Sequence, residues 1–270
     1  MMRDAPTGLL MNLREIRRRA ARAPALFAIL VTAFTSLPAA AADLTLLSAG
    51  ALREPVTQLL AQRSVSLPHV NVSFATAGAI RERLAKGEKP DVVILPSGDL
   101  DGLIGQGVAD SASLRALGET EVGVAVREGA TMPDIGTRDA LRATLLAARK
   151  VVIVDPAKGT SGRLVESMFK DLGIAEAMRD KTLRVDGGYV VEAVARGEAD
   201  LGLHQISEIL PVKGVSLVGS LPADLRRPTR YDVAVLVASA QQEDAKALVG
   251  YLTSGAARGV IEKSGFKPAR

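Results

Sequence analysis

The sequence predicts an α/β protein built as two lobes with a cleft between them. Segments with the apolar pattern of strands alternate with helical patterns along residues 43–270, which is typical of sheets covered by helices on both faces. The chain has 270 residues, 47% of them hydrophobic, so it can bury a large core without disulfides. The number of strand patterns exceeds what one sheet usually holds, so we expect two.

Three pairs of a strand and a helix open this region. The strand patterns cover 43–48, 70–74 and 91–95, and the helix patterns after them cover 52–60, 76–84 and 99–105. The strands are rich in Val, Ile and Leu, and the helices repeat their apolar residues every three or four positions. Such units predict parallel strands joined by crossover helices.

The same alternation resumes at residue 121. Strand patterns cover 121–126, 150–154, 183–185, 200–204, 216–218 and 231–237, and helix patterns cover 139–148, 164–169, 189–195, 243–252 and 256–264. We expect lobe 1 to comprise 43–120 and 238–270, lobe 2 to comprise 127–229, and crossing strands at 121–126 and 230–237 to join them as hinges. Two connections of this kind are typical of a binder that closes over its ligand.

Residues 1–42 have the pattern of a secretory signal peptide. Arg14, Arg17, Arg18, Arg19 and Arg22 precede an apolar stretch over 25–37, and the alanines at 39–42 suit cleavage between Ala42 and Asp43. The apolar stretch is shorter than the roughly 20 residues of a membrane-spanning helix. The chain has no cysteine for a lipid anchor, which favours the periplasm. Met1 and Met11 both fit as the start, and the general and twin-arginine export routes both fit the arginines.

The basic charge of the chain belongs to that signal. The formal net charge is +4, but residues 1–42 hold six Lys and Arg against two acidic residues, which leaves 28 of each sign in residues 43–270. The chain has no Trp, three Tyr and five Phe, so it offers few rings on which bases could stack. A neutral body poor in aromatic residues argues against nucleic-acid binding.

Four turns of small residues each follow a strand pattern and precede a helix pattern. They are 48–51 (SAGA), 76–79 (TAGA), 159–162 (GTSG) and 187–189 (GGY). Open α/β sheets bind ligands at the carboxyl ends of their strands, and the N–H groups at helix starts attract anions. Each turn by itself also fits an ordinary loop with a helix cap. Together the four predict a site for a small anion.

Several long stretches resemble the periplasmic molybdate-binding protein family. They are LTLLSAGALREPV, VNVSFATAGAIRERLAKGEKPDVVIL, VVIVDPAKGTSGRLVESMFKDLGI and VVEAVARGEADLGLHQISEI. The resemblance implies a two-lobe, type II periplasmic-binding fold with the ligand between the lobes. It also implies a monomer without cofactor, metal site or catalysis, which would deliver a molybdate- or tungstate-type oxyanion to the membrane permease of an ABC importer.

The turns and the resemblance together assign the ligand site. The expected ligand-binding residues are Ser48, Gly50, Ala51, Thr76, Ala77, Gly78, Thr160, Ser161, Gly187, Gly188, Tyr189 and Gln205. The resemblance places serines of the family at Ala51 and at Ala77 or Gly78, and its tyrosine at Gln205. A buried oxyanion loses about 1–3 kcal/mol for each missing partner, so the substitutions put molybdate in doubt.

Arginines near the helix starts favour a different ligand. Arg53, Arg81 and Arg163 lie in or near first turns, and the arginine fork suits a carboxylate, although each also fits a solvated helix face. An organic acid, bound for transport or for sensing, is therefore the alternative to an oxyanion.

Catalytic motifs are missing from the sequence. His69 and His204 are its two histidines and have no metal-ligand spacing, and Ser161 lies in GTSG rather than in the G-x-S-x-G elbow. We expect no nucleophile, base and orienting group to assemble and no enzyme. An exported enzyme using Ser161 or His204 is the remaining alternative.

Overall fold

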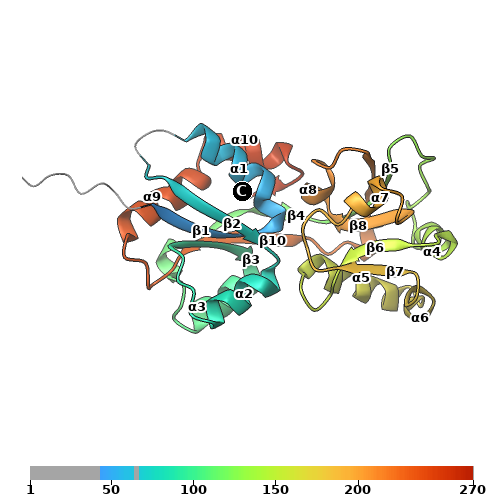
Figure 1. Cartoon of the computed structure of the whole chain (residues 1–270), viewed down its shortest axis with the longest axis horizontal. Coiled ribbons are helices and arrows are strands. Elements are labelled where there is room, and N and C mark those ends of the chain that lie inside the picture. Colours follow the sequence, from blue (N-terminus) through green and yellow to red (C-terminus); the bar gives the residue numbers. More distant parts are fainter. Residues whose placement is uncertain (1–42, 64–66, 270) are drawn as a thin grey trace, which may run out of the picture. The chain divides into compact units, whose positions relative to one another are not determined.

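Residues 43–63 and 67–269 are described by a computed structural model of the chain (Figure 1). The export signal expected over residues 1–42, with its cleavage position, lies outside the described residues. Within them, no helix combines the length and the apolar character needed to cross a membrane.

Lobe 1 is built on a six-stranded sheet with the order β11-β4-β10-β3-β1-β2. Its strands are β1 (Leu44–Ala49), β2 (Val70–Ala75), β3 (Val92–Pro96), β4 (Arg115–Thr120), β10 (Thr229–Val235) and β11 (Lys267–Pro268). Strand β1 pairs in parallel with β2 and β3, whereas β10 runs antiparallel to β3 and β4. The sheet is therefore mixed rather than parallel throughout as predicted, because β10 returns to lobe 1 from lobe 2 and runs against its neighbours.

Lobe 2 is built on a five-stranded sheet with the order β7-β6-β8-β5-β9. Its strands are β5 (Val122–Arg127), β6 (Val151–Val154), β7 (Thr182–Val185), β8 (Leu201–Gln205) and β9 (Val215–Ser220). Strand β6 is parallel to β7 and β8, and β5 is antiparallel to β8 and β9. The predicted two-lobe α/β fold is confirmed.

Helices cover both faces of each sheet (Figure 1). In lobe 1 these are α1 (Arg53–Gln62), α9 (Gln242–Leu252) and α10 (Gly255–Lys263) on one face, with α2 (Ala77–Ala85) and α3 (Ser97–Gly105) on the other. In lobe 2 they are α4 (Arg138–Ala147), α5 (Thr160–Asp171) and α6 (Ala175–Met178) on one face, with α7 (Glu192–Ala195) and α8 (Ile206–Ile209) on the other. Leu, Ile and Val side chains fill the space between the layers.

The chain passes from lobe 1 to lobe 2 at Glu121, between β4 and β5, and returns over residues 221–228, between β9 and β10. The segments expected to cross between the lobes, 121–126 and 230–237, lie mainly in β5 and β10, and each of these strands pairs within one sheet only. The position of the hinges and the exact lobe boundaries stay predictions.

Four of the strands and α-helices were not predicted, namely β4, α6, α8 and β11. Strand β4 has the sequence RALGET, whose alternation is too polar to indicate a strand, and it forms because β10 pairs along it. Helix α8 is a single short turn after β8. The helix predicted over 189–195 is shorter, because only Glu192–Ala195 is helical. The helix predicted over 52–60 follows a 3₁₀ turn, η2 (Gly50–Leu52).

Candidate functional site

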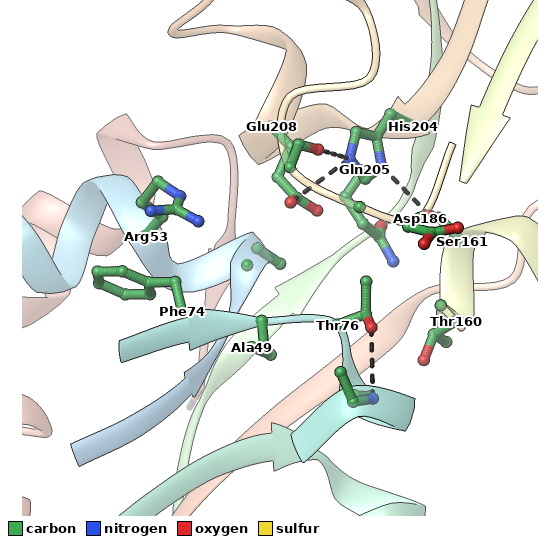
Figure 2. Close-up of a pocket in the computed structure, with 18 of the residues that line it drawn as sticks. Ala49, Arg53, Phe74, Thr76, Thr160, Ser161, Asp186, His204, Gln205 and Glu208 are labelled. Atoms are coloured by element: carbon green, nitrogen blue, oxygen red, sulfur yellow. Dashed lines mark hydrogen bonds and ion pairs between the residues drawn. The ribbon is translucent and has the colours of Figure 1, made fainter. Parts of the chain in front are cut away.

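A cavity of about 330 Å³ lies where the carboxyl ends of β1, β2, β6, β7 and β8 meet. That volume is within the range of small-molecule sites in proteins. Both sheets contribute lining residues, so the cavity lies between the lobes (Figure 2). The topology explains its position, since parallel strands of open α/β sheets leave a crevice beyond their carboxyl ends.

Most of the residues predicted from the small turns line this cavity. They are Gly50, Ala51, Thr76, Ala77, Thr160, Ser161, Gly187, Gly188 and Gln205. Gly187 and Gly188 lie in the loop after β7, and the others lie at the end of a strand or at the start of the following helix. Thr76 caps α2, with its Oγ1 accepting a hydrogen bond from the Ala79 N–H at 3.4 Å.

Three predicted residues do not line it. Ser48 is fully buried inside β1, and its hydroxyl donates to the Ala49 carbonyl at 3.1 Å. Gly78 donates its N–H to the Lys158 carbonyl of lobe 2 at 3.0 Å, so it joins the lobes instead. Tyr189 lies outside the lining and packs its ring near the guanidinium of Arg53, which does line the cavity.

The arginines suggested by the sequence separate into two groups. Arg53 lines the cavity. Arg81 pairs with Asp99 at 3.0 Å, and Arg163 donates to the Thr160 hydroxyl at 3.1 Å from an exposed position. Neither Arg81 nor Arg163 is among the lining residues.

His204 is the centre of a polar cluster that the sequence did not predict. Its imidazole is buried at the cavity, with Nδ1 3.2 Å from the Ser161 hydroxyl and Nε2 3.2 Å from the Gly188 carbonyl. Nε2 also lies 3.4 Å from Oε1 of Glu208 (Figure 2). Ser161 comes from the start of α5, His204 from β8 and Glu208 from α8.

The hydrogen-bond partners define the protonation of this imidazole. Nε2 faces a carbonyl and a carboxylate, which only accept, so Nε2 carries a proton. Nδ1 then accepts from the Ser161 hydroxyl in the neutral ring and donates to it in the imidazolium. Burial lowers the pKa of His204, but the charge of Glu208 and the hydrogen bonds to Glu208 and the Gly188 carbonyl outweigh it, so that the pKa is raised.

The expectation that the chain is not an enzyme stays a prediction, and the structure places three polar side chains in contact at the cavity. Ser161, His204 and Glu208 form a contiguous set, although they are spread over α5, β8 and α8. In the sequence, the only indication of this contact is that Glu208 follows His204 by four positions. That spacing brings side chains together on a helix, but His204 lies in a strand.

Gln205 joins the two lobes beside this cluster. Its Nε2 donates to the Thr229 hydroxyl at 3.0 Å and lies 3.5 Å from the Tyr231 hydroxyl, both on β10. Its Oε1 is buried without a partner in the described part of the chain. With the amide reversed, Oε1 would accept from both hydroxyls. Burial raises the pKa of Tyr231, so its hydroxyl keeps its proton.

Glu208 accounts for the glycine at position 50. A Cβ on Gly50 would lie 2.6 Å from Oε1 of Glu208, a separation that real Cβ atoms do not tolerate. The absent side chain therefore makes room for a carboxylate at the cavity. Among residues 43–63 and 67–269, no group of three or more His, Cys, Asp or Glu side chains is arranged to hold a metal ion.

Comparisons with known proteins agree with this architecture. The family described as bacterial extracellular solute-binding protein matches residues 44–267. The chain is 37% identical to an aconitate isomerase of Pseudomonas sp. over 193 residues, which is 72% of this chain and 73% of that protein. It is 25% identical to the molybdate-binding protein ModA of Escherichia coli (strain K12) over 232 residues, 84% of this chain and 86% of that protein.

A solved structure shows the same fold. The periplasmic molybdate-binding protein of Azotobacter vinelandii superposes with a TM-score of 0.72 at 17% sequence identity, covering 84% of this chain and 100% of that chain. The resemblance inferred from the sequence is confirmed. The chain belongs to the family of bacterial extracellular solute-binding proteins, as a divergent relative of the molybdate-binding ones.

Proposed function

We propose that the chain binds a small organic acid with two or three carboxylates in the cavity and isomerises its double bond by moving a proton. The observation that carries the proposal is the Ser161–His204–Glu208 cluster at the cavity. A binding protein for a simple anion needs hydrogen-bond donors. This cavity also contains the Glu208 carboxylate, which lies 3.4 Å from the His204 imidazole. The similarity to a protein named aconitate isomerase supports this reading.

The two carboxylates that line the cavity argue against a tetrahedral oxyanion bound beside them. They belong to Glu208 and Asp186. An oxyanion about 4 Å from either carboxylate would be repelled by about 4 kcal/mol at an effective dielectric constant near 20. Ala51 and Ala77 contribute no hydroxyl to offset that repulsion. An extended organic acid avoids the conflict, because it can direct its carboxylates elsewhere and turn a CH₂ group toward Glu208.

The proposed reaction is a proton shift across three carbons. Glu208 takes a proton from the CH₂ carbon next to the double bond, and the electron pair spreads over the allylic system and its carboxylates. Glu208 then returns a proton to the former CH carbon, so that the double bond has moved by one position. His204 orients Glu208 through the contact of its Nε2 with Oε1. In aconitate the shift regenerates the same connectivity and allows the cis and trans isomers to interconvert.

The test follows the conversion of cis-aconitate by proton NMR in D₂O. We expect trans-aconitate to form and deuterium to enter the exchanging carbon. Glu208→Gln should slow turnover about 100-fold or more, the usual contribution of a general base, while binding a saturated tricarboxylate at least as tightly, because a repelling charge is removed. Glu262→Gln, at an exposed position of α10, is the matched control.

Two outcomes contradict the proposal. Binding of tricarboxylates without any turnover of cis-aconitate would leave the cavity as a binding site only. Turnover that survives Glu208→Gln would remove Glu208 from the reaction.

Delivery of a solute to a membrane permease is the second candidate function. Membership of the solute-binding family favours it, and export to the periplasm agrees with that role. Thermal-shift measurements with molybdate, tungstate, sulfate and tricarboxylates separate the ligands. Stabilisation by molybdate or tungstate alone would favour an oxyanion carrier over the isomerase.

A further inference from the structure

Arg53 stands out among the lining residues because it contacts two aromatic rings and has no ion-pair partner among the described residues. Its guanidinium carbon lies 4.7 Å from the centroid of the Phe74 ring and 5.7 Å from that of Tyr189. Both distances are within the range of cation–π contacts, about 6 Å. In the part of the chain that the structure describes, no carboxylate forms an ion pair with Arg53, unlike the paired Arg81, Arg83 and Arg138.

Contacts between the Arg53 guanidinium and the two rings leave its N–H donors free for a ligand. A guanidinium contacts rings through its faces, whereas its five N–H donors all point outward in the plane. Ring contacts therefore hold the group in place without using its hydrogen-bonding capacity. The in-plane fork stays available, and it matches the two oxygens of a carboxylate.

Arg53 lies at the end of the cavity away from Ser161, and Glu208 lies between the two in Figure 2. In the view of Figure 2, Arg53 and Phe74 lie at one end of the cavity, while Thr160, Ser161 and Asp186 lie at the opposite end. A ligand that spans the cavity would thus meet a cation at one end and the start of α5 at the other.

We propose that Arg53 is the receptor for one carboxylate of the ligand, and that it selects polycarboxylates over monocarboxylates and tetrahedral oxyanions. The proposal rests on the organic-acid function given above and adds the residue that recognises the substrate class. Arg53 and Phe74 belong to lobe 1, whereas Tyr189 belongs to lobe 2. The second ring therefore reaches Arg53 from across the cleft, which links recognition of this carboxylate to the approach of the lobes.

The experiment measures binding by calorimetry with tricarballylate, a saturated tricarboxylate that cannot be isomerised, and with butyrate and sulfate, both of which we expect to bind more weakly than tricarballylate. For Arg53→Gln we expect a loss of about 100-fold in affinity for tricarballylate, in keeping with a bidentate charged contact. Arg53→Lys should recover only part of the loss, because an ammonium ion is not a planar fork. Tyr189→Leu should cost about fivefold, the value of one cation–π contact. Arg258→Gln, at an exposed position of α10, is the control.

The possible results separate this proposal from the proposed function. If the unaltered protein binds tricarballylate and Arg53→Gln binds it equally well, with an unchanged circular dichroism spectrum, the role of Arg53 is wrong while the organic-acid function stands. If the unaltered protein binds tricarballylate through Arg53 but leaves cis-aconitate unchanged, the isomerase is wrong while Arg53 remains the receptor. If the unaltered protein binds no polycarboxylate, both proposals fail.

Discussion

The carboxylate of Glu208 lies against the backbone of Gly50, where the Cβ of any other residue would be 2.6 Å from its Oε1. Glu208 comes from α8 of lobe 2 and Gly50 from the first turn after β1 of lobe 1. The position of the proposed base thus depends on a missing side chain in the other lobe. This relationship gives the small-residue turn at 48–51 a second role, beside the exposure of backbone N–H groups to a ligand.

Gly50→Ala should displace Glu208 and impair the reaction while leaving the fold intact. A shift of about 1 Å in a catalytic group can cost about 100-fold in rate, so we expect kcat to fall at least tenfold. Gly259→Ala is the matched control, because a Cβ at that position of α10 meets nothing within 4 Å. Steady-state kinetics and thermal unfolding of both variants provide the measurement. Full activity in Gly50→Ala would show that Glu208 has room to move.

The raised pKa of His204 predicts how stability depends on pH. Burial opposes the charge on this imidazole, but Glu208 and the Gly188 carbonyl outweigh it, so the folded protein holds the proton more tightly than the unfolded chain. The resulting stabilisation is complete below the unfolded pKa of about 6.5 and is lost as pH rises through the raised folded pKa.

Thermal unfolding between about pH 5.5 and 9 tests this dependence. The unaltered protein should lose stability toward high pH more steeply than Glu208→Gln, in which burial dominates and the pKa of His204 falls. His69→Gln should behave like the unaltered protein, because His69 is exposed. A pH profile of Glu208→Gln identical to that of the unaltered protein would contradict the assigned role of Glu208.

Gly78→Ala should weaken ligand binding by keeping the lobes apart. The N–H of Gly78 donates to the Lys158 carbonyl at 3.0 Å, and a Cβ on Gly78 would lie 2.6 Å from that oxygen. Only backbone opposes the new methyl group, so the contact must open. We expect the affinity for tricarballylate to fall about tenfold, or about 1.4 kcal/mol.

Small-angle scattering and calorimetry check the result for Gly78. The control is Gly98→Ala in α3, where a Cβ meets nothing within 4 Å. Unchanged affinity and an unchanged scattering profile with ligand would show that this contact does not control closure.

Asp91→Ala should destabilise lobe 1 without affecting the cavity. The buried Asp91 carboxylate accepts hydrogen bonds from the Thr45 N–H and hydroxyl, both at 2.8 Å, and from the Ser239 hydroxyl at 2.6 Å. Hydrogen bonds to a charged group contribute about 1.5–3 kcal/mol each, and their effects overlap, so we expect the free energy of unfolding to fall by about 3 kcal/mol. Urea denaturation measures the loss. A change in ligand affinity would contradict the separation of Asp91 from the site.

Local sequence patterns were sufficient to predict most of the helices and strands. Nearly every predicted strand and helix is present, because apolar periodicity reports which face of an element is buried. The turns at the carboxyl ends of strands were also visible in the sequence, and most of their residues line the cavity. Strand β4 was missed because its sequence RALGET lacks that periodicity, and its pairing with β10 decides its structure.

The sequence by itself therefore determined the two-lobe α/β architecture and the edge of the sheets at which a ligand could bind. Only the tertiary structure decided which side chains meet there. Ser161 and His204 are 43 residues apart, and Arg53 meets Tyr189 from another lobe. Periodicity is a property of neighbours along the chain, whereas these contacts depend on sheet order and on the packing of one lobe against the other. For that reason the sequence did not show that His204 contacts both Ser161 and Glu208.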